Sequence, residues 1–151
     1  AGTLPGGSQC VGVCVSSGWK SCREGRREKV SIMNGVEKGR RGEDLAVAFL
    51  LLKGYKVIHR NWRMKIGEID IIAEHSGTLV FCEVKSRTSL DYGSGAEAVN
   101  SRKQQRIMKT ALLYMQHFHI IDKPCRFDVI EILKVSSKNP SIHHIPDAFG
   151  V

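Results

Sequence analysis

The sequence predicts an α/β domain in which one mixed β-sheet of four to five strands is flanked by helices. Two observations support this prediction. Apolar residues recur at helical spacing in two separate segments, and short β-rich segments stand between and after them. The resulting order of helix, three strands, helix and one or two strands is typical of helices packed on the faces of a sheet.

The first helix is expected at residues 36–53, followed by Gly54 as the residue that ends it. The apolar positions that recur at helical spacing, and that we expect to be buried, are Leu45, Ala48, Phe49 and Leu52. Three strands follow at residues 55–63, 66–75 and 78–87. The short turn at Ser76 and Gly77 predicts that the last two form an antiparallel hairpin.

The second half begins with an expected loop at residues 89–95 and a long helix from Ala96 to Phe118, with Ile107, Ala111, Tyr114 and Phe118 as its apolar stripe. A strand at 126–133 and a short fifth strand within 141–149, ended by Pro146, complete the domain. Because a long helix connects strands 78–87 and 126–133, these two strands are expected to be parallel.

The chain has 151 residues and a formal net charge of +8. We expect residues 1–34, which lack regular periodicity, to be a disordered leader and residues 35–151 to form one domain. The positive charge favours a polyanionic partner such as nucleic acid, or else reflects a basic surface without a specific partner. The sequence contains no apolar run of eighteen residues, so no membrane-spanning helix is predicted. The spacing of the five cysteines indicates neither a disulfide framework nor a zinc site, and we therefore expect the protein in the cytoplasm.

Three charged residues stand inside apolar β-rich segments, namely Asp70, Glu83 and Lys85. In a hairpin centred on Ser76 and Gly77, Asp70 and Glu83 face each other across the two strands, with Cβ atoms roughly 5 Å apart. Two like charges at that distance are destabilising unless a cation lies between them. Mg²⁺ or Mn²⁺ would resolve the conflict, and Lys85 on the same face could then stabilise charge on a phosphate. The alternative is a salt bridge from Lys85 to Glu83 or Asp70 on an exposed face of the sheet.

Residues 36–149 also resemble the uncharacterised YraN-like family of predicted endonucleases, which is related to the archaeal Holliday junction resolvases. The matching segments are GRRGEDLAVAFLLLKGY, RNWR, GEIDIIA, VFCEVKSR, EAV…RK, RFDVIEI and IHHIPDAF. Asp70 followed by Glu83-Val84-Lys85 is similar to the Asp…Glu-x-Lys signature of restriction-endonuclease-like nucleases.

This resemblance implies a restriction-endonuclease-like fold and metal-dependent cleavage of DNA, with branched DNA as one candidate substrate and a homodimer as one candidate state. It implies that Asp70, Glu83 and the Val84 carbonyl bind Mg²⁺ or Mn²⁺, that Lys85 supports the nucleophile, and that Glu43 contributes a further acid.

Basic residues outside this cluster are candidates for phosphate contacts. The expected second helix carries Arg102, Arg106 and Lys109 on one face with Lys103 alongside, and Arg40, Arg41 and Arg63 lie near the expected acids in the chain. An ordinary solvated helix face is the alternative.

Three functions therefore stay open: a nuclease, a nucleic-acid-binding module with a degenerate acidic site, and a structural partner in a larger complex. His143 and His144 could bind a metal or lie at the rim of the core, and Trp62 could pack in the core or stack on a base.

Overall fold

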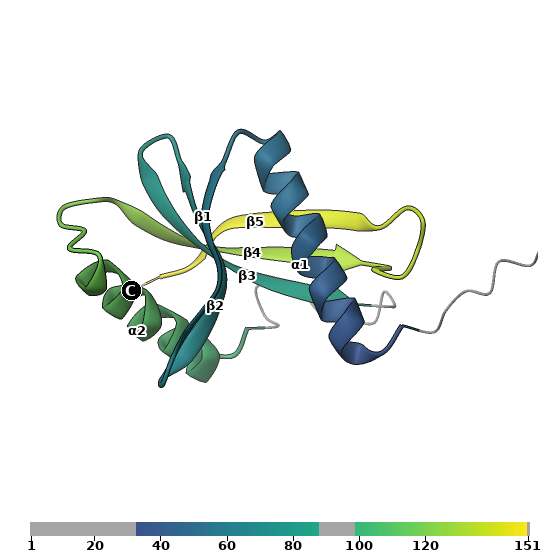
Figure 1. Ribbon diagram of the computed structural model, residues 1–151, viewed down its shortest axis with the longest axis horizontal. Coiled ribbons are helices and arrows are strands. Elements are labelled where there is room, and N and C mark those ends of the chain that lie inside the picture. The colour runs from purple at the N-terminus through teal and green to yellow at the C-terminus, as the bar shows by residue number, and fades with distance from the viewer. Residues whose placement is uncertain (1–32, 88–98, 151) are drawn as a thin grey trace, which may run out of the picture. The chain divides into compact units, whose positions relative to one another are not determined.

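The computed structural model describes residues 33–87 and 99–150 (Figure 1). Its elements are α1 (Gly35–Leu52), β1 (Lys56–Met64), β2 (Gly67–His75), β3 (Thr78–Arg87), α2 (Ser101–His117), β4 (Cys125–Leu133) and β5 (Ser141–Phe149). The leader expected at residues 1–34 lies outside the described residues except for its last two positions, and the loop expected at 89–95 lies wholly outside them.

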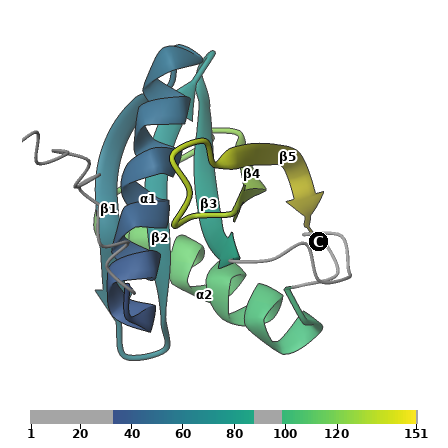
Figure 2. The same ribbon diagram turned by 90° about the vertical axis from the view of Figure 1, so that its right-hand side faces the viewer.

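The strands form one mixed sheet in the order β1-β2-β3-β4-β5. All neighbouring strands are antiparallel except β3 and β4, which are parallel as expected from the long connection through α2. The two helices pack against opposite faces of this sheet, as comparison of Figure 1 and Figure 2 shows. The architecture confirms the expected α/β class and is consistent with a restriction-endonuclease-like fold.

Both faces of the sheet are buried, because each face has its own helix. Along β3, Val80 and Cys82 belong to the core under α1, while Leu79 and Phe81 belong to the core under α2. β3 also pairs with a strand on each side, so its residues have little access to water. A charged group in this strand therefore lies in a far drier environment than one on an exposed sheet face.

The buried face of α1 differs from the one expected. Its fully buried positions are Gly42, Ala46 and Leu50, whereas the expected Ala48 and Leu52 are exposed. A Cβ atom on Gly42 would lie 1.7 Å from the Ser86 Oγ, so the absence of a side chain allows the helix to approach β3 closely. Hydrophobic periodicity misses such a face, because glycine and alanine contribute little to an apolar stripe.

Two expected boundaries in the second half are also wrong. α2 begins at Ser101 instead of Ala96, because the Asn100 side chain caps it by accepting a hydrogen bond of 2.9 Å from the backbone N–H of Lys103. β5 continues past Pro146, since it is an edge strand in which a missing N–H is tolerated. Neither helix of the described part of the chain combines the length and apolar character needed to cross a bilayer.

Candidate functional site

The β2–β3 hairpin has the expected register. Ile71 pairs with Cys82 and His75 with Thr78, around a turn in which Ser76 and Gly77 both have positive φ angles of 49° and 78°. Two successive residues of this conformation are typical of the turns that join antiparallel strands tightly. The next residues outward, Asp70 and Glu83, therefore reach the same end of the hairpin.

A pocket of about 570 Å³ lies at this end of the sheet. We call it the carboxylate pocket, and it contains Glu43, Asp70, Glu83, Val84 and Lys85, the residues for which the resemblance implies a catalytic or metal-binding role. Its lining residues are Gly35, Lys38, Gly39, Glu43, Glu68, Asp70, Glu83, Val84, Lys85, Ser86, Arg87 and Lys103. Four separate elements, α1, β2, β3 and α2, thus supply side chains to one cavity.

Glu43 reaches the pocket because of the close packing of α1 on β3. Its neighbour Gly42 is the residue that contacts Ser86, which sets the distance between helix and strand. The Glu43 carboxylate also accepts a hydrogen bond of 2.8 Å from the side-chain amide of Asn61 on β1. Only the resemblance indicated Glu43, and nothing in the sequence pattern indicated Asn61, whose contribution depends on how β1 lies beside α1.

The surroundings of Asp70 on balance favour the neutral form of its carboxyl group. Its Oδ2 accepts a hydrogen bond of 2.7 Å from the backbone N–H of Val84, the residue after Glu83. Burial raises the pKa of Asp70, and the neighbouring Glu83 charge raises it further, to about 7, against the opposing effects of the Val84 N–H and Lys103. The two carboxyl groups therefore repel each other when both are ionised, as expected from the hairpin geometry.

Glu83 is almost completely buried, with a side chain only 2% exposed, and its two oxygens have different surroundings. Oε1 receives the ammonium groups of Lys85, at 3.1 Å, and of Lys103 from α2. Oε2 is buried without a hydrogen-bond partner in the described part of the chain. The salt bridge of Lys85 with Glu83 that we considered as an alternative is thus present, although it lies in a buried pocket and not on an exposed face.

Lys103 was expected only as a phosphate contact, so its position at Glu83 was missed. Burial lowers the pKa of its ammonium group, but the hydrogen bond to Glu83 and the charge of that carboxylate outweigh burial, so the pKa lies above its ordinary value. The group is therefore a cation at neutral pH and neutralises part of the charge on the two carboxylates.

The donor set of the carboxylate pocket fits a small hard cation. Within residues 33–87 and 99–150, no group of three or more His, Cys, Asp or Glu side chains is arranged as a complete protein-only metal site. Magnesium, however, is commonly held by only one or two carboxylates and keeps several waters. Asp70 and Glu83 supply two such groups, and the buried Glu83 Oε2 is an oxygen ligand that has no donor from the described protein.

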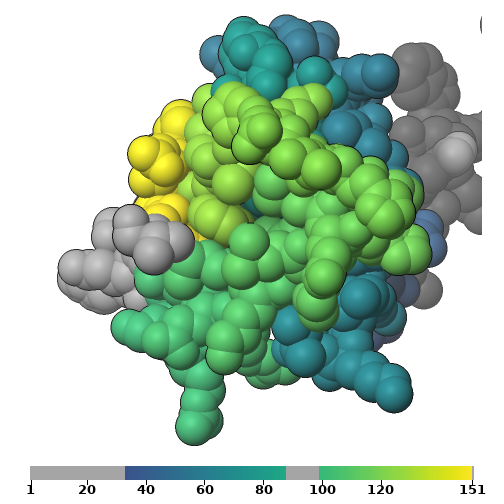
Figure 3. All heavy atoms as spheres, turned by 90° about the vertical axis from the view of Figure 1, so that its left-hand side faces the viewer, coloured from purple at the N-terminus to yellow at the C-terminus, as the bar shows by residue number. Residues whose placement is uncertain are grey.

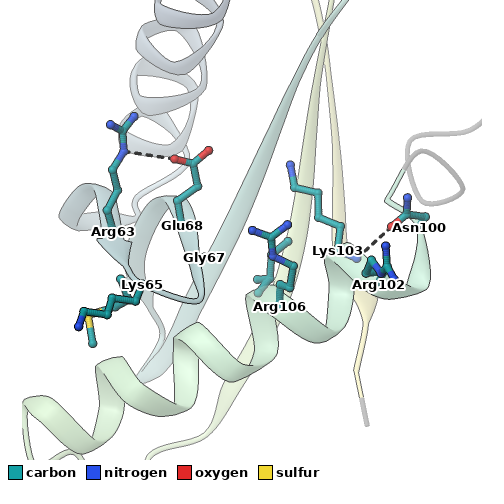
Figure 4. Close-up of a pocket in the computed structure, with 10 residues that line it drawn as sticks. Arg63, Lys65, Gly67, Glu68, Asn100, Arg102, Lys103 and Arg106 are labelled. Carbon is teal, nitrogen blue, oxygen red and sulfur yellow. Dashed lines mark hydrogen bonds and ion pairs between the residues drawn. The ribbon is translucent and has the colours of Figure 1, made fainter.

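A second cavity, of about 630 Å³, lies between the β1–β2 hairpin and the first half of α2. We call it the basic pocket, and Figure 4 shows Arg63 and Glu68 on the hairpin facing Lys103 and Arg106 on the helix. In the view of Figure 3, the green spheres of α2 cover much of the face, and the blue-green hairpin projects beside them. The basic pocket shares Glu68 and Lys103 with the carboxylate pocket, so the two cavities adjoin.

The predicted phosphate-contacting residues divide into two sets. Arg63, Arg102, Lys103 and Arg106 line the basic pocket, together with Lys65. Arg106 also donates a hydrogen bond of 3.2 Å from Nε to the Ile66 carbonyl and so braces the hairpin against α2.

The remaining three lie elsewhere. Arg41 donates a hydrogen bond of 3.0 Å to the carbonyl of Ser137, in the segment between β4 and β5. Arg40 and Lys109 are exposed and line neither pocket.

The histidines of β5 belong to a different polar cluster. His144 Nε2 lies 2.8 Å from Oδ2 of Asp128, a fully buried residue that also accepts hydrogen bonds from Arg126 and the backbone N–H of Asp147. Burial raises the pKa of Asp128, but these hydrogen bonds more than reverse the effect, so the pKa is lowered.

Neither β5 histidine lines the carboxylate pocket, and His143 lies 3.2 Å from the Ser141 hydroxyl. Trp62 packs edge-on against Tyr114, with ring centroids 5.2 Å apart, so it contributes to the core under α2.

Comparison with known proteins identifies relatives across the described domain. The model for the family described as "Uncharacterised protein family UPF0102" matches residues 42–132. A UPF0102 protein of Clostridioides difficile is 43% identical over 117 residues, which cover 78% of this chain and all of the relative. UPF0102 proteins of Prosthecochloris aestuarii and Geobacter metallireducens are 47% and 48% identical, over 74% of this chain and 91% and 90% of theirs.

Proposed function

The chain belongs to the uncharacterised protein family UPF0102, and from that premise we propose that it is a metal-dependent endonuclease that hydrolyses phosphodiester bonds in DNA. The observation that supports this proposal most is the pair formed by the partly buried Asp70 and the buried Glu83, two carboxyl groups that repel each other and leave one buried oxygen without a hydrogen-bond donor in the described part of the chain. A protein retains such an arrangement at a cost in stability, which is typical of functional sites.

In this proposal Asp70, Glu83 and the Val84 carbonyl would hold Mg²⁺ or Mn²⁺. Such an ion would polarise a phosphate and lower the pKa of a bound water. Lys85, which lines the same pocket 3.1 Å from Glu83, would neutralise negative charge that develops on the phosphate. Glu43, oriented by Asn61, would help to orient the attacking water.

The basic pocket would position the substrate. Its arginine and lysine side chains line a cavity that adjoins the carboxylate pocket at Glu68 and Lys103, and contacts of this kind bind phosphates without reading sequence. We propose the cytoplasm as the compartment, since Cys82 and Cys125 are both free thiols. Branched DNA as the substrate and a homodimer as the working state stay predictions.

The test is a cleavage screen on single-stranded, duplex, flap and four-way DNA with Mg²⁺ and Mn²⁺. We expect the wild type to cut at least one substrate and Asp70→Asn and Lys85→Ala to lose about 100-fold or more of that activity. Both variants should keep DNA affinity in a gel shift. Lys56→Gln, which removes an exposed charge at the start of β1, is the control and should cut normally. Full activity in both site variants would exclude this pocket as the active site.

A non-catalytic nucleic-acid-binding module is the second candidate. It is favoured by the two ammonium groups on Glu83, which neutralise much of the charge of the site without any metal. This function predicts DNA binding that weakens with salt, no heat of binding for Mg²⁺ or Mn²⁺ at millimolar concentration, and no cleavage in the same screen.

A further inference from the structure

Lys103 occupies a position that its local structure does not favour. It lies in the first turn of α2, three residues after the cap Asn100, and this turn contains no acidic residue. The amino end of a helix carries partial positive charge, so cations there are destabilising. A charge placed against this rule points to a role outside the helix.

The charge balance of the carboxylate pocket indicates what this role is. The pocket is lined by four acidic side chains and four basic ones, namely Glu43, Glu68, Asp70 and Glu83 against Lys38, Lys85, Arg87 and Lys103. Adding a divalent cation would leave two excess positive charges beside a Glu83 side chain that is only 2% exposed. Either a protein cation must leave, or an anion must enter.

Lys103 is better able to leave than Lys85. Its side chain is 39% exposed, against 25% for Lys85, and it stands on a helix instead of a central strand. It also lines both cavities, so its four-carbon chain begins between the carboxylates and the cations of the basic pocket. Figure 4 shows its side chain extending away from the backbone of α2.

We propose that Lys103 is an exchangeable counter-ion, which pairs with Glu83 in the metal-free protein and moves to a substrate phosphate when a divalent cation binds the carboxylates. The idea rests on the proposed function. It makes metal and nucleic acid bind cooperatively. The metal ion displaces the Lys103 ammonium group from Glu83, and a DNA phosphate provides that group with a new partner of opposite charge. The protein would then hold its metal weakly until DNA is present.

The experiment is isothermal titration of Mn²⁺ into the full chain, with and without a short DNA duplex. Without DNA, Lys103→Met should bind Mn²⁺ about ten-fold more tightly than the wild type, because the competing charge is gone. DNA should raise the Mn²⁺ affinity of the wild type by a larger factor than that of the variant, because a phosphate can contact the ion in both proteins but Lys103 leaves Glu83 only in the wild type. Lys56→Met, which removes an exposed charge at the start of β1 outside both pockets, is the control and should behave as the wild type.

The outcomes separate this inference from the proposed function. If Lys103→Met binds Mn²⁺ no more tightly than the wild type, while Asp70→Asn abolishes binding, the metal site stands and the counter-ion role is wrong. If neither the wild type nor Lys103→Met binds Mn²⁺, or if Asp70→Asn binds it normally, both ideas fail.

A measurement on the wild type covers the case in which Lys103→Met does not fold. The Cε resonance of Lys103 in protein containing ¹³C-lysine should shift as Mg²⁺ saturates the site, and that of Lys109 should not. An unchanged Lys103 resonance at saturation would overturn the inference.

Discussion

Asp70→Asn should make the metal-free protein more stable at neutral and alkaline pH, although it removes a residue of the candidate active site. The amide is close to the carboxyl group in size, and its oxygen can still accept the hydrogen bond from the Val84 N–H. The substitution therefore removes the buried charge and its repulsion with Glu83 while keeping the local geometry.

The magnitude follows from the pKa of Asp70. Burial and the Glu83 charge raise this pKa from 3.8 to about 7, so the folded state binds more protons than the unfolded state between these values. Proton binding by Asp70 therefore contributes to the free energy of unfolding of the wild type. This contribution is complete below about pH 4 and is lost as the pH rises through about 7. The difference between the pKa values of Asp70 in the folded and unfolded states corresponds to at most about 4 kcal/mol of the free energy of unfolding.

Urea denaturation of both proteins in EDTA at several pH values between about 4 and 8 measures this effect. Asp70→Asn should match the wild type near the acid end and exceed it increasingly toward pH 8. Excess Mg²⁺ at pH 8 should narrow the gap by stabilising only the wild type. A difference that does not change with pH, or a variant that is less stable at pH 8, would refute the reasoning.

Three further predictions concern the packing and the charges around the site. Gly42→Ala should lower the free energy of unfolding by about 1–3 kcal/mol in urea denaturation, because its methyl group would collide with Ser86. A Cβ atom at Gly39 would meet nothing within 4 Å, so Gly39→Ala should change that free energy by less than about 1 kcal/mol. Equal losses in the two variants would contradict the close packing of α1 on β3. Asp128→Ala should cost about 3–5 kcal/mol at neutral pH, because it leaves Arg126 and His144 without their buried partner. Since the pKa of Asp128 is lowered, the greater stability of the wild type should disappear as the pH falls through the folded-state pKa of Asp128, as thermal unfolding can measure. If Asp128→Ala is still less stable than the wild type below that pH, the ion pair is not the cause. Arg102→Gln should reduce the slope of log affinity for DNA against log salt by about 1, measured by fluorescence anisotropy, while Lys56→Gln should leave it unchanged; equal slopes for both variants would remove Arg102 from the interface.

Much of the sheet and part of the site could be predicted from local sequence. Alternation of apolar residues and the Ser76-Gly77 turn were enough to predict the β2–β3 register, because a two-residue turn fixes which positions face each other. That register brings Asp70 and Glu83 to one end of the hairpin. Strong local signals of this kind need no knowledge of the rest of the chain.

The errors have two causes, namely a contact with a distant element for α1 and a local capping residue that was overlooked for α2. The buried face of α1 was misjudged because Gly42 and Ala46, which carry almost no hydrophobic signal, are the residues that contact the sheet. The start of α2 was misjudged because the capping side chain of Asn100 outweighs the apolar pattern before it.

The sequence by itself determined the order of the strands along the chain, the hairpin register and therefore the carboxyl pair, because these depend on neighbours within about twenty residues. Only the tertiary structure decided that a second core would bury β3 on both faces, that α1 would bring Glu43 to the pocket, and that Lys103 would reach Glu83 from α2. The physical reason is that burial and charge pairing are properties of assembled surfaces. A residue's pKa and partners are set by the elements packed around it, and a local pattern cannot record them.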